Sequence, residues 1–413
     1  MNRTIKVQLN TSPEQVQALH ETLEQFTKAF NHVCRYGWEH RQKNGVALHH
    51  ATYYETKALC PDLVSDLLIQ ARTKASEAVK SALTWKVKHE KSYPKKVENA
   101  LKKGKPAPKF KPIQCPHSEL CPIRYNEKTY VLNWQANIVR LSTTQGRMSI
   151  PFSIPTYGTK YQGYPPCTAD LIYKKGRFSL HIVVSVPEPE FKRTDEVIGV
   201  DLGLNRPAVT SNRQFLGSRQ WKEIDRRSLR LRRTLQSKGT KSAKRHLKKL
   251  SQKQRRFHRD CDHVLSKRIV QNAPTGSTIV LENLTNIRET SKMGRGKDKK
   301  NVGQKRRLHS WTFAQLYSFI CYKAQARGIA VEKIDPRYTS QTCSACGYQH
   351  RSNRRSQSFF QCRQCGYSLH ADLNASYNIR SKYLALFGTS LESGPTSCGL
   401  SHPPQGEMQA SVL

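Results

Sequence analysis

Acidic residues are scarce in this 413-residue chain, which holds 30 Asp and Glu against 70 Lys and Arg and carries a formal net charge of +40. Solubility alone requires far less charge than this. So large an excess of positive charge indicates a polyanionic partner, and nucleic acid is the expected polyanion. On charge alone, a ribosomal or chromatin-like structural protein is the simpler alternative.

Long apolar runs are also missing. No stretch of 18 apolar residues occurs, so we expect no membrane span. The first ten residues, MNRTIKVQLN, lack the apolar core of a signal peptide. We therefore expect the protein to stay inside the cell, in the cytoplasm. Disulfides are rare in that compartment, so the twelve cysteines should be metal ligands or buried thiols. The irregular spacing of Cys115, His117 and Cys121 argues against a metal site there.

Two matched cysteine pairs stand out late in the chain. Cys343 and Cys346 form one C-x-x-C pair, Cys362 and Cys365 form another, and fifteen residues separate the two pairs. Each pair is followed by a glycine, which allows the backbone to turn tightly around a metal. Four thiolates at this spacing are typical of zinc, and a closed set of four leaves no open position for catalysis. The pattern predicts a structural zinc site rather than a redox or disulfide pair.

The first half of the chain predicts a small β-barrel with a helical insertion. A strand at Arg3–Leu9 is followed by two helical stretches, one from Thr11 onward and one over Asp62–Lys88. The Lys/Pro-rich run 91–112 reads as a basic connector without a core. Further strands are predicted at Thr129–Leu132, Ile138–Leu141, Arg147–Ile150, Thr168–Tyr173 and Arg177–Val186. We expect residues 1–10 and 110–190 to form the barrel and residues 11–109 to be the insertion and linker.

Three acids in the second half have a special setting. Asp201 ends the apolar strand 197–200, Glu282 ends the strand 277–281, and Asp372 opens the helix 373–383. From residue 197 onward the predicted order is three strands, a helix, a strand, a helix, a strand and a helix, the order of a ribonuclease-H-like fold. Mg²⁺ prefers such hard oxygen ligands. Two ions about 4 Å apart can activate a water and stabilise the leaving oxygen of a phosphodiester. We therefore predict that the three acids form a catalytic Mg²⁺ site.

A long basic stretch lies between the first two of these acids. Residues 226–259 contain fifteen Lys and Arg and no acid, and the composition predicts a helix. Like charges at i,i+4 repel, so this stretch should line a groove for a polyanion. The candidate nucleic-acid contacts are Arg226, Arg227, Arg230, Arg232, Arg233, Lys244, Arg245, Lys248, Lys249, Lys253, Arg255 and Arg256. The nearby acids Asp225, Asp262 and Asp335 do not end apolar strands, and we predict no site there. The Gly/Lys/Arg-rich segment 288–307 and the tail 387–413 are expected to be disordered in the free protein.

In the order and spacing of its motifs the chain resembles the TnpB family of insertion-sequence-encoded, RNA-guided nucleases, which are related to the type V CRISPR effectors. The matching pieces are GVDLG at 199–203, VLENL at 280–284, TSQTCSACG at 339–347 and the Cys-Gly that leads into DLNA at 372–375. They cover residues 197–383 firmly and the first half only in outline.

The resemblance implies an α+β protein of several domains. It implies an N-terminal wedge barrel with a helical recognition insert, a RuvC-like nuclease domain over 191–340 and 371–386, a zinc ribbon over 341–370, and a tail over 387–413. It also implies a guide RNA and a target DNA as partners, with Asp201, Glu282 and Asp372 as the metal-binding triad.

One departure from the family pattern lies beside the third acid. The family usually has Asp-Arg-Asp where this chain has His370-Ala371-Asp372, so the support of the metal-binding acid is weaker and His370 is expected to face solvent. An RNA-guided DNA-binding regulator with a silent site is therefore the first alternative. A transposase accessory protein is the second, although the sequence shows no Tyr or Ser recombinase motif.

Overall fold

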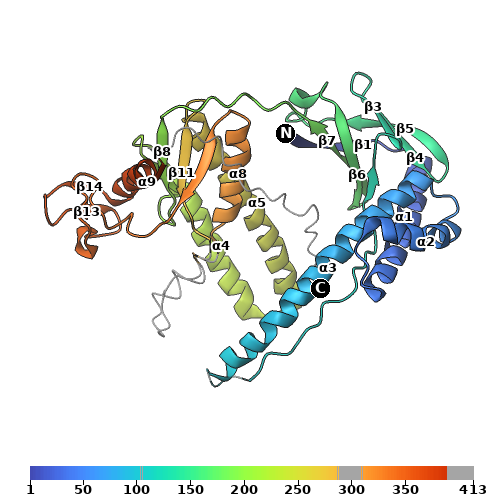
Figure 1. The fold of residues 1–413 in the computed structure, drawn as a ribbon, viewed down its shortest axis with the longest axis horizontal. Coiled ribbons are helices and arrows are strands. Elements are labelled where there is room, and N and C mark those ends of the chain that lie inside the picture. Colours follow the sequence, from blue (N-terminus) through green and yellow to red (C-terminus); the bar gives the residue numbers. More distant parts are fainter. Residues whose placement is uncertain (103, 105, 286, 288–307, 309, 388–413) are drawn as a thin grey trace. The chain divides into compact units, whose positions relative to one another are not determined.

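The computed structural model describes the whole chain except residues 103, 105, 286, 288–307, 309 and 388–413 (Figure 1). The segment 288–307 and all but the first residue of the tail 387–413, both expected to be disordered, lie outside the described residues. The chain divides into two compact units, Met1–Pro187 and Glu188–Leu413. None of the described helices is long and apolar enough to cross a membrane.

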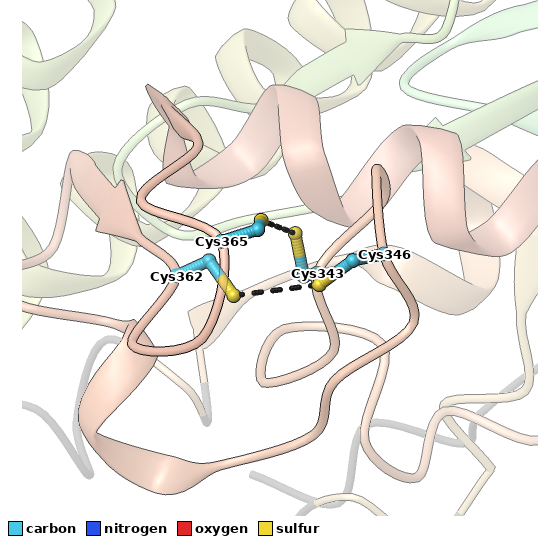
Figure 2. A group of neighbouring side chains, drawn as sticks. All are labelled: Cys343, Cys346, Cys362 and Cys365. Carbon is cyan, nitrogen blue, oxygen red and sulfur yellow. Dashed lines mark hydrogen bonds between the residues drawn. The ribbon is translucent and has the colours of Figure 1, made fainter.

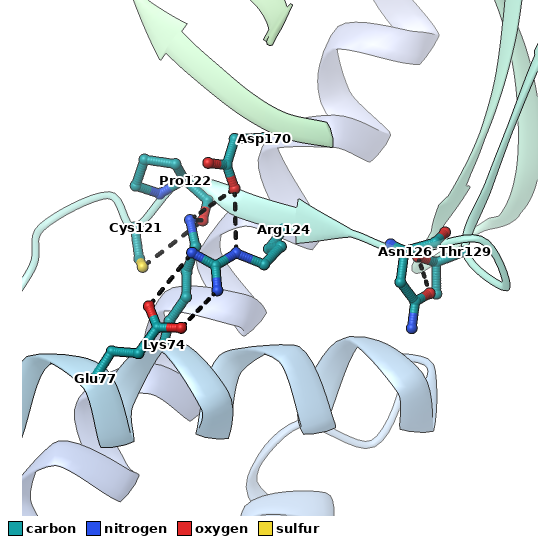
Figure 3. Close-up of polar contacts among 8 residues, drawn as sticks. All are labelled: Lys74, Glu77, Cys121, Pro122, Arg124, Asn126, Thr129 and Asp170. Carbon is teal, nitrogen blue, oxygen red and sulfur yellow. Dashed lines mark hydrogen bonds and ion pairs between the residues drawn. The ribbon is translucent and has the colours of Figure 1, made fainter. Parts of the chain in front are cut away.

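The first unit contains an antiparallel sheet of seven strands in the order β2-β6-β7-β1-β5-β4-β3. The strands are β1 Asn2–Leu9, β2 Ile123–Tyr125, β3 Tyr130–Asn133, β4 Ile138–Thr143, β5 Gly146–Ser153, β6 Pro166–Lys174 and β7 Arg177–Ser185. The two edge strands, β2 and β3, follow one another in the chain. A turn joins them, and in it the Thr129 hydroxyl donates to Asn126 Oδ1 over 2.9 Å (Figure 3). The sheet therefore curls until it is nearly closed, which is the coarse form of the predicted barrel.

The insertion after β1 consists of three helices, α1 Pro13–Glu39, α2 Gly45–Leu59 and α3 Ser65–Leu101. Ser12 caps α1 in a reciprocal capping box with Gln15, the start that the sequence indicates. Helix α2 was not predicted.

Helix α3 is longer than the predicted helix, so the prediction of a connector is wrong for residues 91–101. Pro94 lies inside this helix. The returning chain packs against the extra turns, since the Phe110 ring lies 5.2 Å from that of His89 and 4.8 Å from that of Tyr93. These contacts stabilise the extension in spite of the proline.

Charged side chains connect this insertion to the sheet (Figure 3). Lys74 Nζ lies 3.0 Å from Asp170 Oδ1 on β6 and also donates to the Pro122 carbonyl oxygen over 2.7 Å. Arg124 on β2 pairs with Glu77 of α3 over 2.9 Å. Because both pairs join α3 to the sheet, the helices and the strands form a single packed unit.

The second unit is built on a five-stranded sheet in the order β10-β9-β8-β11-β12. Its strands are β8 Val197–Asp201, β9 Ala208–Thr210, β10 Phe215–Leu216, β11 Thr278–Glu282 and β12 Ala330–Ile334. Strands β8, β11 and β12 are parallel, whereas β9 and β10 are antiparallel to their neighbours. The helices are α4 Arg219–Lys238, α5 Lys241–Gln271, α8 Phe313–Gln325 and α9 Ala371–Phe387.

Helices cover both faces of this sheet. Alternate strand residues such as Ile198 and Leu281 pack against α5 and α8, while Val280 and its neighbours pack against Ile379 of α9. The contact with α9 is close. A Cβ atom added to Gly199 would lie 2.2 Å from the Ser376 carbonyl oxygen, so only glycine permits α9 to approach β8.

The basic stretch 226–259 was predicted as one helical run, and this prediction is wrong. Gly239, with φ of 64°, ends α4, and the Thr240 side chain caps the start of α5. The two helices pack side by side through Leu235, Ala243 and Leu250 (Figure 1). The region is therefore a helical hairpin rather than a single rod.

Candidate active site

The four paired cysteines meet in one cluster, and all their sulfur atoms lie within 4.8 Å of one another (Figure 2). Cys343 Sγ lies 3.8 Å from Cys365 Sγ, and Cys346 Sγ lies 3.6 Å from Cys362 Sγ. A tetrahedron with Zn–S bonds of about 2.3 Å has edges of about 3.8 Å. The donor set and its spacing therefore fit a structural zinc. Within the described part of the chain, this is the one group of three or more His, Cys, Asp or Glu side chains whose ligand atoms lie close enough to hold a metal ion. Cys115 and His117 belong to no such group.

Contacts within residues 341–370, the cysteine module, stabilise its fold. Gly347 and Gly366 follow the two pairs with φ of 76° and 74°, which other residues rarely adopt. The buried Asn353 side chain donates to the carbonyl oxygens of Gln341 and Tyr348 and accepts from the amide of Arg363. One side chain thus joins both cysteine-bearing segments.

Asp201 and Glu282 are brought together by strand register. Val200 pairs with Leu281 on the neighbouring parallel strand, so Asp201 and Glu282, the last residues of the two strands, lie at the same end of the sheet. The Thr339 hydroxyl donates to Glu282 Oε1 over 2.6 Å. Since Thr339 opens the segment that leads into the cysteine module, this module orients the second acid.

Asp372 lies in the first turn of α9 and is 7% exposed. It is therefore part of the helix rather than the residue before it. The side chains of Asn374 and Asn378 both donate to the Thr342 carbonyl oxygen, and Asn374 also accepts from the Ser344 amide. These bonds hold α9 against the cysteine module.

Arg354 of the module contacts Asp372 directly, with Nη2 3.2 Å from Oδ1. Both side chains are largely shielded, at 27% and 10% exposure. Sequence reasoning missed Arg354, because an arginine in a basic loop has no local pattern that distinguishes it from its neighbours. Thr339 was also missed as a contact of Glu282, although it lies within the quoted block 339–347.

The charges of Glu282 and Asp372 both act on the carboxylate of Asp201. Burial raises the pKa of Asp201 well above its usual value, and the charges of Glu282 and Asp372 raise it further. Burial also raises the pKa of Glu282, against the effects of the Thr339 hydroxyl, Lys382 and Arg354. The cluster is thus a site of concentrated negative charge that a cation would stabilise.

One expectation about a side chain near the acids needs correction, and one buried acid was not anticipated. His370 is half-buried rather than turned to solvent, since its ring packs 4.9 Å from Phe215 and its Nδ1 accepts from the Asp372 amide. Asp262 is buried at 8% exposure and accepts from the Thr312 hydroxyl over 2.6 Å. Neither setting follows from the local sequence, because both depend on segments distant in the chain.

The predicted nucleic-acid contacts lie along the hairpin of α4 and α5. Eleven of the twelve are exposed, and Arg232 is half-buried with a bond to the Gln254 side chain. Arg226 and Arg227 pair with Glu223 on the same helix. The hairpin thus presents dense positive charge, with few acids to offset it.

The fold and the motifs have counterparts among known proteins. Residues 181–288 match the family model "Probable transposase", and residues 313–379 match "Cas12f1-like, TNB domain". The chain is 30% identical over 266 residues to the CRISPR-associated endodeoxyribonuclease Cas12f1 of Syntrophomonas palmitatica. The match covers 52% of this chain and 51% of that protein. The chain is also 34% identical over 137 residues to the TnpB-like protein MJ0751 of Methanocaldococcus jannaschii. This match covers 33% of this chain and 46% of that protein.

A solved structure, the cryo-EM structure of the Cas12f1-sgRNA-target DNA complex, matches in fold. The TM-score is 0.59 with 18% identity, over 89% of this chain and 83% of that chain. The two chains therefore share an α+β fold, which in this protein includes a nearly closed first sheet and a four-cysteine cluster. The family models and relatives confirm the resemblance to the TnpB/Cas12f family that the sequence motifs indicate. The chain spans about half the length of the two curated relatives.

Proposed function

We propose that the protein is an RNA-guided DNA endonuclease that cuts guide-matched DNA by phosphodiester hydrolysis. The observation that carries this proposal is the cluster of Asp201, Glu282 and Asp372, in which burial and mutual repulsion raise the pKa of Asp201. A structural protein would gain nothing from that repulsion, which lowers its stability. A hydrolase uses it to bind divalent cations beside a phosphate. The names of the relatives, as endodeoxyribonuclease and TnpB-like protein, agree with this function.

The proposed architecture assigns a role to each part of the chain. Residues 1–10 and 110–190 form a wedge-type barrel, and residues 11–109 form the recognition insert and its linker. Residues 191–340 and 371–386 form a RuvC-like nuclease domain, and residues 341–370 form a zinc ribbon. The alternation of β8, β11 and β12 with helices on both faces supports the nuclease assignment.

The carboxylates would hold Mg²⁺ as a pair of ions, and that metal would supply a nucleophilic water and charge stabilisation for the leaving oxygen. The residues of the chain do the rest. Asp201 and Glu282 are fixed by strand register, and Thr339 orients Glu282 by a hydrogen bond. Arg354 offsets part of the negative charge and orients Asp372. A zinc ion held by Cys343, Cys346, Cys362 and Cys365 would be structural and would stabilise the segment that carries Arg354.

The hairpin of α4 and α5 would bind the phosphate backbone of guide RNA or target DNA. Its exposed Lys and Arg side chains suit a sequence-independent contact. Pairing between guide and target would read the sequence, while the protein reads backbone shape. The net charge of +40 supports a partner of this kind.

A cleavage assay with the purified ribonucleoprotein tests the proposal. With Mg²⁺ the wild-type complex should cut a matched duplex, whereas Asp201→Ala should bind the duplex and leave it uncut. Equal behaviour of the two proteins would refute the enzyme assignment. Sequencing the RNA that copurifies with the protein identifies the guide.

A silent RNA-guided regulator is the second candidate, because His370 and Ala371 stand where the family usually has Asp and Arg. The contact between Arg354 and Asp372 argues for an active site, since it provides a guanidinium beside the third acid. Binding without cleavage by the wild-type complex would establish the regulator.

A further inference from the structure

A cavity in the second unit lies outside the carboxylate cluster. Its volume is about 620 Å³, within the range of sites for small organic ligands. It opens among α4, α5, the segment that leads into α8, and the loop that follows Asp201. Nothing in the proposed metal site uses it.

Aromatic rings form much of the wall of this cavity. Trp221 comes from α4, Phe257 from α5, and Trp311 from the segment before α8. All three are half-buried, so part of each ring remains accessible from the cavity. Such rings provide stacking surfaces that accept the face of any nucleobase.

Carboxylates add hydrogen-bond acceptors to the same wall. Asp225 and Asp262 both line the cavity, and Asp225 is held in place by His258 Nε2 at 2.7 Å. An ionised carboxylate only accepts hydrogen bonds, so it selects ligands that present N–H groups. Guanine presents two neighbouring N–H donors on one edge, and uracil presents only one.

A second, basic cavity of about 720 Å³ adjoins the first. The two share Asn205, Pro207, Ser218, Lys222 and Arg226 in their walls. The second cavity adds Arg206 and Arg219, both exposed, whereas its one acid, Glu223, is paired with Arg226 and Arg227. An aromatic cavity thus adjoins a positively charged one, which matches the base and the phosphate of a nucleotide.

We propose that these adjoining cavities bind one unstacked nucleotide of a nucleic acid strand, with the base against Trp221 and the phosphate near Arg206 and Arg219. The preferred base is guanine. The inference rests on the proposed function in one respect, namely that a strand reaches the loop after Asp201. Bound there, the nucleotide fixes the position of that strand relative to the carboxylates.

Binding of mononucleotides to the purified full-length protein tests the inference by calorimetry. GMP should bind at least about tenfold more tightly than ribose 5-phosphate, because stacking contributes only when a base is present. UMP should bind more weakly than GMP. Trp221→Leu should weaken GMP binding about tenfold and leave ribose 5-phosphate unchanged, while Arg219→Gln should weaken both ligands.

The matched control is Trp85→Leu, which removes an exposed tryptophan of α3 and should leave GMP binding unchanged. Equal affinity for GMP and ribose 5-phosphate, or unchanged GMP binding by Trp221→Leu, would overturn the proposal. Arg206→Gln, at an exposed position, gives a second readout if Trp221→Leu does not fold. Asp201→Ala should bind GMP normally, so a failure of the nuclease proposal remains distinguishable from a failure of this one.

Discussion

Arg354 of the cysteine module forms an ion pair with Asp372 of α9, with Nη2 3.2 Å from Oδ1. This ion pair connects the cysteine module to the carboxylate cluster. We expect Arg354→Ala to lower the rate of DNA cleavage at least about tenfold, because loss of a charge-assisted bond of about 1.5–3 kcal/mol misplaces Asp372. Arg354→Lys should recover part of the rate. Zinc content should not change, and the exposed neighbour variant Arg355→Ala should cut as wild type does. Full activity of Arg354→Ala would contradict the role.

Neutralising one acid of the cluster should stabilise the protein while abolishing cleavage. Asp201→Asn removes a carboxylate whose pKa is raised by burial and by Glu282 and Asp372. A gain of about 1 kcal/mol corresponds to a rise in Tm of about 2–4 °C for a unit of this size. Mg²⁺ should raise the Tm of wild type and should do so far less for the variant. Asp335→Asn, at a carboxylate that is 51% exposed, is the control and should change neither quantity. An equal Mg²⁺ effect on both variants would place the cation elsewhere.

Replacing two cysteines should remove the zinc. Cys343→Ser combined with Cys362→Ser breaks both pairs of the cluster, so we expect about one zinc per chain to be lost, as measured by metal analysis. Cleavage should fall with it, because the module carries Arg354 and supports Thr339. Cys167→Ser, at an exposed cysteine of the first unit, should keep its zinc and its Tm. Unchanged zinc content in the double variant would refute a metal role for these cysteines.

The stability of the second unit should fall as the pH rises from 4 to 8. Burial raises the pKa of Asp262 to about 6, against the effects of Thr312 and His258. The unfolded chain releases this proton near pH 4, so the stability that the bound proton contributes is present below pH 4 and is lost as the pH rises through 6. The hydrogen bond to Asp225 raises the pKa of His258 against burial, and its contribution is likewise lost as the pH rises through the folded pKa.

Asp262→Asn should therefore flatten the dependence of Tm on pH, by an amount on the order of 1–3 kcal/mol across this window. Thermal melts at several pH values measure the effect. Asp260→Asn, at an exposed position of the same helix, should keep the wild-type slope. A variant at Asp262 that melts with the wild-type pH profile would show that this carboxyl does not titrate in the folded protein near pH 6.

The salt dependence of nucleic acid binding should report on the α4 and α5 hairpin. Replacing Arg230, Lys244 and Lys248 with glutamine should lower the slope of log K against log salt by about 2–3, if each side chain neutralises one phosphate. Fluorescence anisotropy with guide RNA gives the slope. The control replaces Lys174, Lys175 and Arg177, which are exposed at the turn between β6 and β7 of the first unit. An unaltered slope in the hairpin variant would mean that these charges face solvent.

Much of the site could be predicted because its chemistry is recorded in short patterns. Each cysteine pair is local, since two thiolates three residues apart on a tight turn face one metal. Asp201 and Glu282 could be found because each ends an apolar strand, and parallel strands end at one edge of a sheet.

Other features depend on residues that are distant along the chain. The extension of α3 past Lys91 is stabilised by Phe110, and composition alone indicated a connector there. Asp262 is buried because Thr312 and the cavity wall surround it, and its local sequence gives no sign of this burial. Local secondary-structure propensity does not predict these contacts.

The sequence by itself determined the candidate ligand types, namely four thiolates and three carboxylates, and the strands that carry two of the acids. Only the tertiary structure decided which side chains support them. Arg354 is one of three arginines among residues 351–355, and it alone of the three forms an ion pair with Asp372 among the described contacts. The physical reason is that an ion pair needs a specific distance and shielding from water, which the packing of the cysteine module against α9 creates.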